Sequence, residues 1–194
     1  MTVVVAKAIW VFGLAAWCLV RYPFERRARR LAVARRIDRA RERVLVAIAW
    51  CGLVVTPLAY ALSGAPSFAD YAFQPIQGFA GALVLCGALW LLWRSHQDLG
   101  RQWSTMLEIR DQHRLTTGGI YRRLRHPMYA AFWLWALAQA LLLPNWIAGG
   151  AGLVGFGALF FGRVGREERL MLETFGEEYR AYMARTHRII PGIY

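Results

Sequence analysis

Several features that support common protein classes are scarce in this chain of 194 residues. Lysine occurs once, at Lys7, and arginine supplies the rest of a formal net charge of +12. Charged residues make up 19% of the chain, below the about 25% usual for soluble domains, while 57% of residues are apolar. The high apolar content excludes intrinsic disorder. It also argues against a nucleic-acid partner, which the basic charge alone would suggest.

Cysteine is also scarce, with only three residues, Cys18, Cys51 and Cys86. They lie far apart in apolar runs and form no CxxC pair, which argues against a disulfide framework and against a zinc site. We therefore expect no metal centre, and we expect the three cysteines to be small buried hydrophobic residues.

Long charge-free windows are the main positive signal. A bilayer core about 30 Å thick requires about 20 helical residues. The first run lacks a preceding basic segment and a small-residue cleavage site, so we expect a membrane helix and not a signal peptide. The first three windows predict transmembrane helices at 2–20, 44–62 and 75–93.

The fourth charge-free window, 129–162, is too long for one ordinary span. Its middle reads Leu143-Pro144-Asn145-Trp146, and proline disfavours a continuous helix there. We therefore predict a hairpin of two helices, 127–143 and 146–163. Glycines would let the second helix pack closely on its neighbours, and these are Gly149, Gly150, Gly152, Gly155 and Gly157.

The arginines orient the five predicted helices. Residues 21–43 carry a net charge of +7, residues 94–125 carry +4 and the tail from Arg163 carries +1, whereas residues 63–75 carry only Asp70. Arginine-rich loops stay cytoplasmic. All rich segments then fall on one side, which places the N-terminus outside and the C-terminus inside.

The expected fold is an all-α integral membrane protein, with residues 1–194 as a single membrane domain. Residues 1–93 supply three transmembrane helices and a basic cytoplasmic loop at 21–43, whose arginines would bind anionic lipid head groups and fix the topology. The predicted spans carry charge only near their ends, at Lys7 and Arg163, which argues against a transporter. Polar chemistry is therefore expected at the cytoplasmic face, in 94–125 and 163–194.

The segment before the fourth helix carries candidate binding residues. Gly118 and Gly119 allow a close backbone approach to a ligand. Proline is favoured at the first helical position, so Pro127 places His126 at the helix cap. The amide groups there, with Arg125 beside them, suit an anion such as a carboxylate. The alternative is a lipid-interface cap with a snorkelling arginine and an interfacial Tyr129.

The tail places the adjacent carboxylates Glu167 and Glu168 directly after the fifth helix. They could attract a sulfonium or accept hydrogen bonds from ribose hydroxyls, or they could be a solvated helix start. Aromatic and apolar residues then recur on one face of an amphipathic C-terminal helix, which could cover a pocket built by the His126 segment. These residues are Met171, Phe175, Tyr179 and Tyr182.

Together these pieces resemble the isoprenylcysteine carboxyl methyltransferase family, integral-membrane enzymes related to phospholipid methyltransferases. The resemblance covers 99–194, about half of the chain. It rests on Leu99-Gly100, Trp103-Ser104, Gly119-Ile120-Tyr121, Arg125-His126-Pro127-Met128-Tyr129, Glu167-Glu168, Phe175-Gly176-Glu177-Glu178-Tyr179 and Ile190-Pro191.

The resemblance implies an S-adenosylmethionine-dependent methyltransferase, with 94–194 as its cofactor-binding half. One departure is Ala131, where the family often has glycine, and it concerns helix packing. By this likeness Glu167 and Glu168 would hold polar ends of the cofactor. The pocket would be lined by His113, Gly118, Tyr121, Arg125, His126, Pro127 and Tyr129.

The expected acceptor is lipophilic, and the resemblance implies the carboxylate of a prenylated cysteine as a candidate. Its tail could enter between helices from the bilayer. A carboxylate is ionised at neutral pH and needs no general base, but it needs a cation to orient it. Arg163 and Arg166 are the candidates for that role. An amine acceptor would instead need a base such as Glu167 or Glu168. Two alternatives are an NADPH-dependent reductase related to sterol reductases and a non-enzymatic membrane scaffold.

Overall fold

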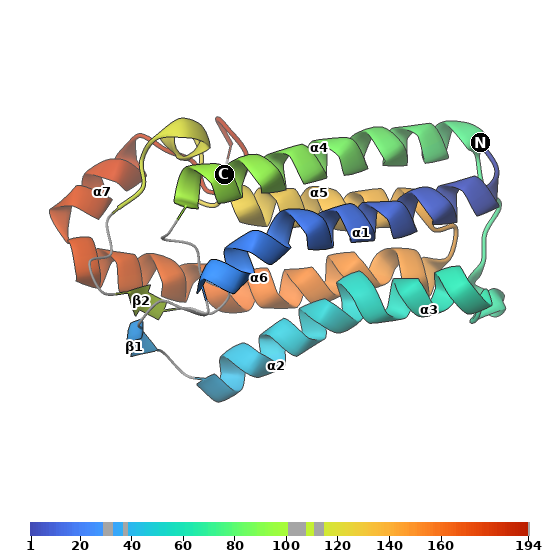
Figure 1. Ribbon diagram of the computed structural model, residues 1–194, viewed down its shortest axis with the longest axis horizontal. Helices are drawn as coiled ribbons and strands as arrows, with labels where there is room; N and C mark the ends of the chain where they lie inside the picture. The colour runs from blue at the N-terminus through green and yellow to red at the C-terminus, as the bar shows by residue number, and fades with distance from the viewer. Residues whose placement is uncertain (29–32, 37–38, 101–107, 111–114, 194) are drawn as a thin grey trace.

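The computed structural model describes residues 1–28, 33–36, 39–100, 108–110 and 115–193, and it is an elongated bundle of helices (Figure 1). Its elements in chain order are α1 (Val3–Ala28), β1 (Val33–Arg36), α2 (Arg39–Trp50), the π-helical turn η1 (Cys51–Val55), α3 (Thr56–Ser63), the 3₁₀ turn η2 (Ser67–Ala69), α4 (Pro75–Leu99), β2 (Glu108–Arg110), the 3₁₀ turn η4 (Gly119–Arg122), α5 (Pro127–Leu142), α6 (Trp146–Phe175) and α7 (Glu177–Ala184).

The predicted membrane segments are confirmed as long apolar helices. Four of them are long and apolar enough to cross a bilayer, namely Val3–Arg27, Ala40–Ser63, Pro75–Leu99 and Trp146–Phe175, and Pro127–Leu142 is a shorter apolar helix. The helices α2 and α3 form one span because η1 continues the helix between them. The chain is therefore an integral, multi-pass membrane protein.

Two helices extend beyond their predicted ends. The helix α1 continues to Ala28 with Pro23 inside it, and α6 continues to Phe175 instead of ending near 163. No proline interrupts the polar end of α6, and the helix stops only at Gly176, whose φ of 53° favours glycine. As a consequence, the paired glutamates lie on α6 itself.

The expectation of a purely helical chain needs one correction. The strands β1 and β2 form a two-stranded antiparallel pair, with Val33 opposite Arg110 and Arg36 opposite Glu108. The pair joins the basic segment 21–43 to the segment that follows α4. Neither segment has the alternating apolar pattern of a half-buried strand, so periodicity gave no sign of this pairing.

The hairpin predicted between the fourth and fifth helices is confirmed. The helix α5 ends at Leu142 and α6 begins at Trp146, with Asn145 as its N-cap. The Asn145 side chain accepts hydrogen bonds from the backbone amides of Ile147 and Ala148, and it donates to Asp70 at 2.8 Å. This buried asparagine therefore caps α6 and ties the hairpin to the loop before α4.

The glycines of α6 do not share one role. A Cβ at Gly155 would lie 2.8 Å from the carbonyl oxygen of Ile48 on α2, and a Cβ at Gly52 would lie 2.3 Å from that of Ala151. At Gly150 a Cβ would meet no atom within 4 Å. Close packing of α6 therefore depends on Gly155 and its partner Gly52, whereas Gly150 faces open space.

We predict that Gly155→Ala lowers stability by about 1–3 kcal/mol, the usual cost of overpacking, because the backbone of α2 must move. The matched variant Gly150→Ala on the same helix is expected to be neutral or slightly stabilising, because alanine favours helix more than glycine. Thermal unfolding of the two detergent-purified variants checks the pair. Equal melting temperatures would contradict the proposed helix contact.

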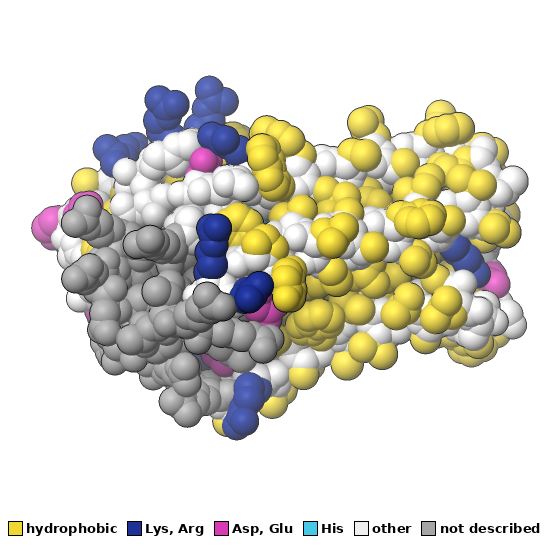
Figure 2. All heavy atoms as spheres, viewed as in Figure 1, with side chains coloured by type: hydrophobic (Ala, Val, Ile, Leu, Met, Phe, Trp, Pro, Cys, Tyr) yellow, Lys and Arg dark blue, Asp and Glu magenta, His cyan; other side chains and the backbone are white. Residues whose placement is uncertain are grey.

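The surface divides into the apolar sides of the helix bundle and one basic end (Figure 2). Basic side chains gather at the end where α1 finishes, α2 begins and α7 lies (Figures 1 and 2). Lys7 is near the start of α1, and Asp70 is in the loop between η2 and α4. The prediction that the cysteines are buried is wrong, because all three are exposed. In a membrane protein the outer surface meets lipid, so an apolar side chain gains nothing by facing inward.

Candidate functional site

The start of α5 is held by the C-terminal segment of the chain. Pro127 occupies the first helical position and His126 the cap, as predicted. The backbone amide of Arg125 donates to the carbonyl of His187 at 2.7 Å, and that of His126 donates to Arg188 at 2.9 Å. These two amides are therefore occupied by protein, and an anion at this cap would have to use other donors.

Glu168 is the centre of a buried ion cluster. Its side chain is 5% exposed and accepts from Arg125 Nε at 3.1 Å and from Arg188 Nη2 at 2.7 Å. The Nε2 atom of His126 lies 3.4 Å from its Oε1 atom. Arg125 also donates to the carbonyl oxygens of Met183 and Thr186, so the cluster joins α5, α6 and the segment after α7.

Glu167 has different surroundings, although it is the next residue. Its side chain is 27% exposed, and its Oε2 atom accepts from the Tyr129 hydroxyl at 2.5 Å and lies 3.5 Å from Arg163 Nε. His126 Nδ1 lies 3.8 Å from its Oε1 atom. Glu167 is therefore the more accessible of the two carboxylates, and the His126 ring lies between them.

Aromatic side chains hold Tyr129 in place beside the Glu167 carboxylate. Its ring stacks with that of His126, with centroids 5.3 Å apart and an interplanar angle of 17°. On its other side it meets Phe160 at 5.6 Å and Phe156 at 6.1 Å, both in edge-on geometry. Both phenylalanines lie on α6, so packing within the membrane bundle fixes the direction in which the Tyr129 hydroxyl points.

Two members of the site, Glu42 and Arg188, carried no sequence signal. Arg163 is buried and its Nη1 atom lies 3.4 Å from Glu42 Oε2, which is also buried. Glu42 stands among the arginines of 21–43, where it reads as one more charge of a basic loop. Arg188 lies close to the Ile190-Pro191 motif, but nothing in the spacing points it at Glu168. Only the tertiary packing brings both residues to the site.

The C-terminal helix differs from its prediction. The expected amphipathic face is divided at Gly176, so Met171 and Phe175 end α6 while Tyr179 and Tyr182 lie on α7. Both tyrosines are buried, and burial raises the pKa of Tyr182 to about 12. The neutral Tyr182 hydroxyl donates to the carbonyl of Tyr121 at 2.7 Å. The helix α7 therefore packs on η4, where Tyr121 is buried.

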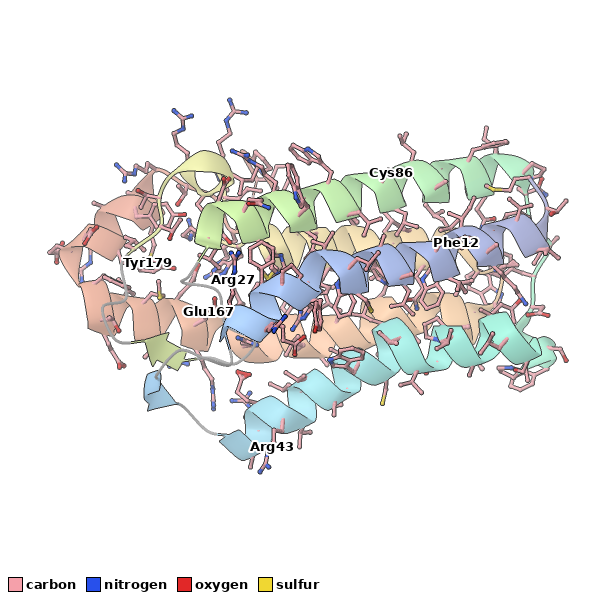
Figure 3. All side chains as sticks on the ribbon, in the orientation of Figure 1. Phe12, Arg27, Arg43, Cys86, Glu167 and Tyr179 are labelled. Atoms are coloured by element: carbon pink, nitrogen blue, oxygen red, sulfur yellow. The ribbon has the colours of Figure 1, made fainter. Side chains whose placement is uncertain are left out.

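The remaining predicted residues are less central. Gly118 is exposed just before η4, with open space where a Cβ would stand, and Arg166 is half-buried on α6. His113 lies outside the described residues. Figure 3 shows Glu167 at the same end of the bundle as Arg27 and Tyr179, away from Phe12. The site thus lies where the apolar helices give way to the basic end.

Sequence comparison matches the range that holds this site. The model of the isoprenylcysteine carboxyl methyltransferase (ICMT) family matches residues 80–173. A probable protein-S-isoprenylcysteine O-methyltransferase of Oryza sativa subsp. indica is 34% identical over 96 residues, which cover 48% of this chain and 50% of the relative. The Schizosaccharomyces pombe protein-S-isoprenylcysteine O-methyltransferase is 28% identical over 159 residues, covering 74% and 67%.

Structure comparison agrees on the fold. A solved structure of a eukaryotic intramembrane Ras methyltransferase, ICMT, superposes with a TM-score of 0.52 at 20% identity, covering 81% of this chain and 55% of that one. The chain spans about half the length of the first curated relatives that it matches. The matched range runs from α4 into α6 and contains η4, His126 and both glutamates. These findings confirm the resemblance seen in the sequence: residues 80–173 carry the pattern of the isoprenylcysteine carboxyl methyltransferase family on a helical membrane fold like that of ICMT.

Proposed function

We propose that the chain is an integral-membrane methyltransferase that uses S-adenosylmethionine and acts on a lipophilic acceptor, with the carboxylate of a prenylated cysteine as its substrate group. The observation that carries the proposal is the cluster of Glu167, His126, Tyr129 and Arg163 at one end of an apolar bundle. This cluster lies inside the range that matches the family, and the curated relatives are named for this reaction.

The side chains at the site fit the cofactor chemically. S-adenosylmethionine has a sulfonium, an amino acid end, a ribose diol and an aromatic base, and it supplies an activated methyl group when bound. Glu167 offers a carboxylate that is still partly exposed, for a cation or for hydroxyl donors. The His126 and Tyr129 rings are buried and stack on each other beside it, so they form a wall of the site. Under this proposal the pocket is completed by Gly118, Tyr121 and Pro127. His113 is proposed as a further member, although it lies outside the described residues.

Glu168 has a different proposed role from the one that the family resemblance implied. Its oxygens already accept from Arg125 and Arg188 and face His126. A carboxylate so fully partnered holds the protein together more than it holds a ligand. We assign Glu168 and Arg125 to positioning the His126 ring and the C-terminal segment around the pocket.

The acceptor carboxylate needs orientation and exclusion of water more than proton transfer. It is ionised at neutral pH, so no side chain has to act as a base. Arg166 is the more accessible of the two candidate cations, whereas Arg163 is locked between Glu42 and Glu167. We propose that Arg166 contacts the acceptor carboxylate and that Arg163 positions Glu167.

The membrane location suits such an acceptor. The basic end of the bundle is proposed to face the cytoplasm, with the N-terminus outside and the C-terminus inside, because arginine-rich segments stay on the cytoplasmic side. The water-soluble cofactor then reaches the site from the cytosol. An apolar acceptor tail reaches the same end through the bilayer.

Transfer of a labelled methyl group from S-adenosylmethionine to a small prenylcysteine tests the proposed reaction. Two matched acceptors serve as controls: the prenylcysteine methyl ester, which lacks a free carboxylate, and the same cysteine without its prenyl chain. Methylation of the prenylcysteine alone is expected. Methylation of the ester, or equal rates with and without the prenyl chain, would contradict the assigned substrate group.

We predict that Arg163→Lys weakens S-adenosylhomocysteine binding about three- to tenfold, because Arg163 positions the Glu167 carboxylate that is proposed to hold the cofactor. Lysine keeps the charge beside Glu42 but loses the planar fork that reaches Glu167 as well. Calorimetric titration measures the effect, and Arg169→Lys at an exposed position of α6 is the control. Unchanged cofactor affinity in Arg163→Lys would show that Arg163 does not position Glu167 for the cofactor.

A further inference from the structure

A cleft of about 530 Å³ lies outside the site just described, between the end of α4 and η4. Its lining contains no member of the Glu167 and Glu168 clusters. Its volume falls within the about 300–1,000 Å³ that is typical of small-molecule sites. The lining residues are Trp90, Arg94, Gly119, Ile120, Arg122 and Arg123.

The cleft is held in shape by a carboxylate beneath it. Asp98 accepts from the backbone amide of Ile120 at 2.8 Å and pairs with Arg94 at 3.1 Å. Gly119 has a φ of 58°, and a Cβ there would lie 2.1 Å from Asp98 Oδ2. Only glycine allows the loop to approach Asp98 this closely, so η4 is fixed against the end of α4.

Cations dominate the polar part of the lining. Arg122 and Arg123 are exposed, and neither forms an ion pair with a carboxylate of the described residues. Arg94 shares its charge with Asp98 and is still 43% exposed. The three arginines therefore exceed the one carboxylate by two charges. This excess suits an anion with one or two negative charges.

An apolar stripe leads from the cleft along α4. Ile76, Phe79, Leu83 and Trp90 are 57–79% exposed and recur at helical spacings of three, four and seven, and Arg94 follows four residues later on the same face. Figure 2 shows basic side chains at the basic end of the molecule, next to the apolar sides of the helix bundle. A tryptophan between an apolar face and a basic group is typical of the membrane–water interface.

We propose that this cleft binds the phosphate of an anionic phospholipid, with the acyl chains lying along the α4 stripe. Basic pockets beside transmembrane helices at the cytoplasmic side are suited to anionic head groups. A free phosphate would use the arginines but not the stripe, so the juxtaposition of both favours a lipid. The proposal does not depend on the methyltransferase function, because the two sets of residues differ.

Native mass spectrometry of the full chain in mild detergent tests the proposal. Phosphatidylglycerol and phosphatidylcholine with the same acyl chains are the probes, and inorganic phosphate is the competitor. The first variant is Arg122→Gln/Arg123→Gln. The matched control is Arg169→Gln/Arg185→Gln, which removes the same charge from exposed positions at the same end of the bundle and outside the segment 21–43.

One phosphatidylglycerol per chain is expected to bind in preference to phosphatidylcholine. The cleft variant is expected to bind it about thirtyfold more weakly, since each interfacial basic residue contributes about fivefold. The control variant is expected to change affinity by less than about threefold. Trp90→Ala, at an exposed position, is expected to weaken binding without changing the charge.

Three results would overturn the proposal. Equal binding of phosphatidylcholine and phosphatidylglycerol would show that the arginines do not select an anionic head group. Equal losses of phosphatidylglycerol affinity in the cleft and control variants would show that the overall charge of the basic end attracts the lipid. Displacement of the lipid by millimolar inorganic phosphate alone would make the cleft a phosphate site with no use for the stripe.

Discussion

Replacing Glu167 with glutamine is expected to weaken S-adenosylhomocysteine binding about ten- to hundredfold while the protein stays folded. A hydrogen bond to a charged group contributes about 1.5–3 kcal/mol, and the substitution removes the charge but keeps the shape. Glu167 is 27% exposed, and its neighbours Tyr129 and Arg163 keep other contacts within the bundle. Folding should therefore tolerate the change.

Calorimetric titration of the detergent-purified Glu167→Gln variant measures its dissociation constant for S-adenosylhomocysteine. The control is Glu178→Gln, which removes a carboxylate from an exposed position at the same end of the chain. The control is expected to bind like the unmodified protein. A Glu167→Gln protein with normal affinity would place the cofactor pocket elsewhere.

Replacing the adjacent Glu168 with alanine is expected to have the opposite phenotype, a large loss of stability. The change leaves Arg125, whose side chain is 10% exposed, without its buried carboxylate, and it also releases Arg188. Removing one partner of a buried ion pair costs about 3–5 kcal/mol. For a chain of this size that corresponds to a fall in Tm of at least about 6 °C.

Thermal unfolding of Glu168→Ala beside Glu178→Ala measures this difference. Adding Arg125→Met to Glu168→Ala should recover part of the lost stability, because the uncompensated cation is then removed as well. A Glu168→Ala protein as stable as the Glu178→Ala control would show that the cluster does not hold the C-terminal segment. The two neighbouring glutamates would then have no separate roles.

The sequence predicted the spans well, because a membrane imposes simple constraints on length and charge. Apolar runs had to be about 20 residues long, and the turn at Pro144 and Asn145 had to divide the longest run. The His126 cap was equally predictable, because proline at the next position starts a helix. These features depend on neighbours in the sequence alone.

The remaining features depend on contacts between distant segments. Glu42 reaches Arg163, and Arg188 reaches Glu168, only because the helices bring their ends together. The polar extension of α6 to Phe175 was missed because its charges resemble those of a loop, although no proline interrupts the helix before Gly176. The exposure of Cys86 was missed because burial was inferred from apolarity, which does not hold on a lipid-facing surface.

The most direct test of the central claim is titration of the purified, unmodified protein with S-adenosylhomocysteine and, separately, with NADPH. Binding of about one S-adenosylhomocysteine per chain, with no binding of NADPH, is the result expected for the proposed cofactor pocket around Glu167 and His126. Binding of NADPH alone would contradict the account in favour of a reductase, and binding of neither would leave a membrane protein without the proposed cofactor.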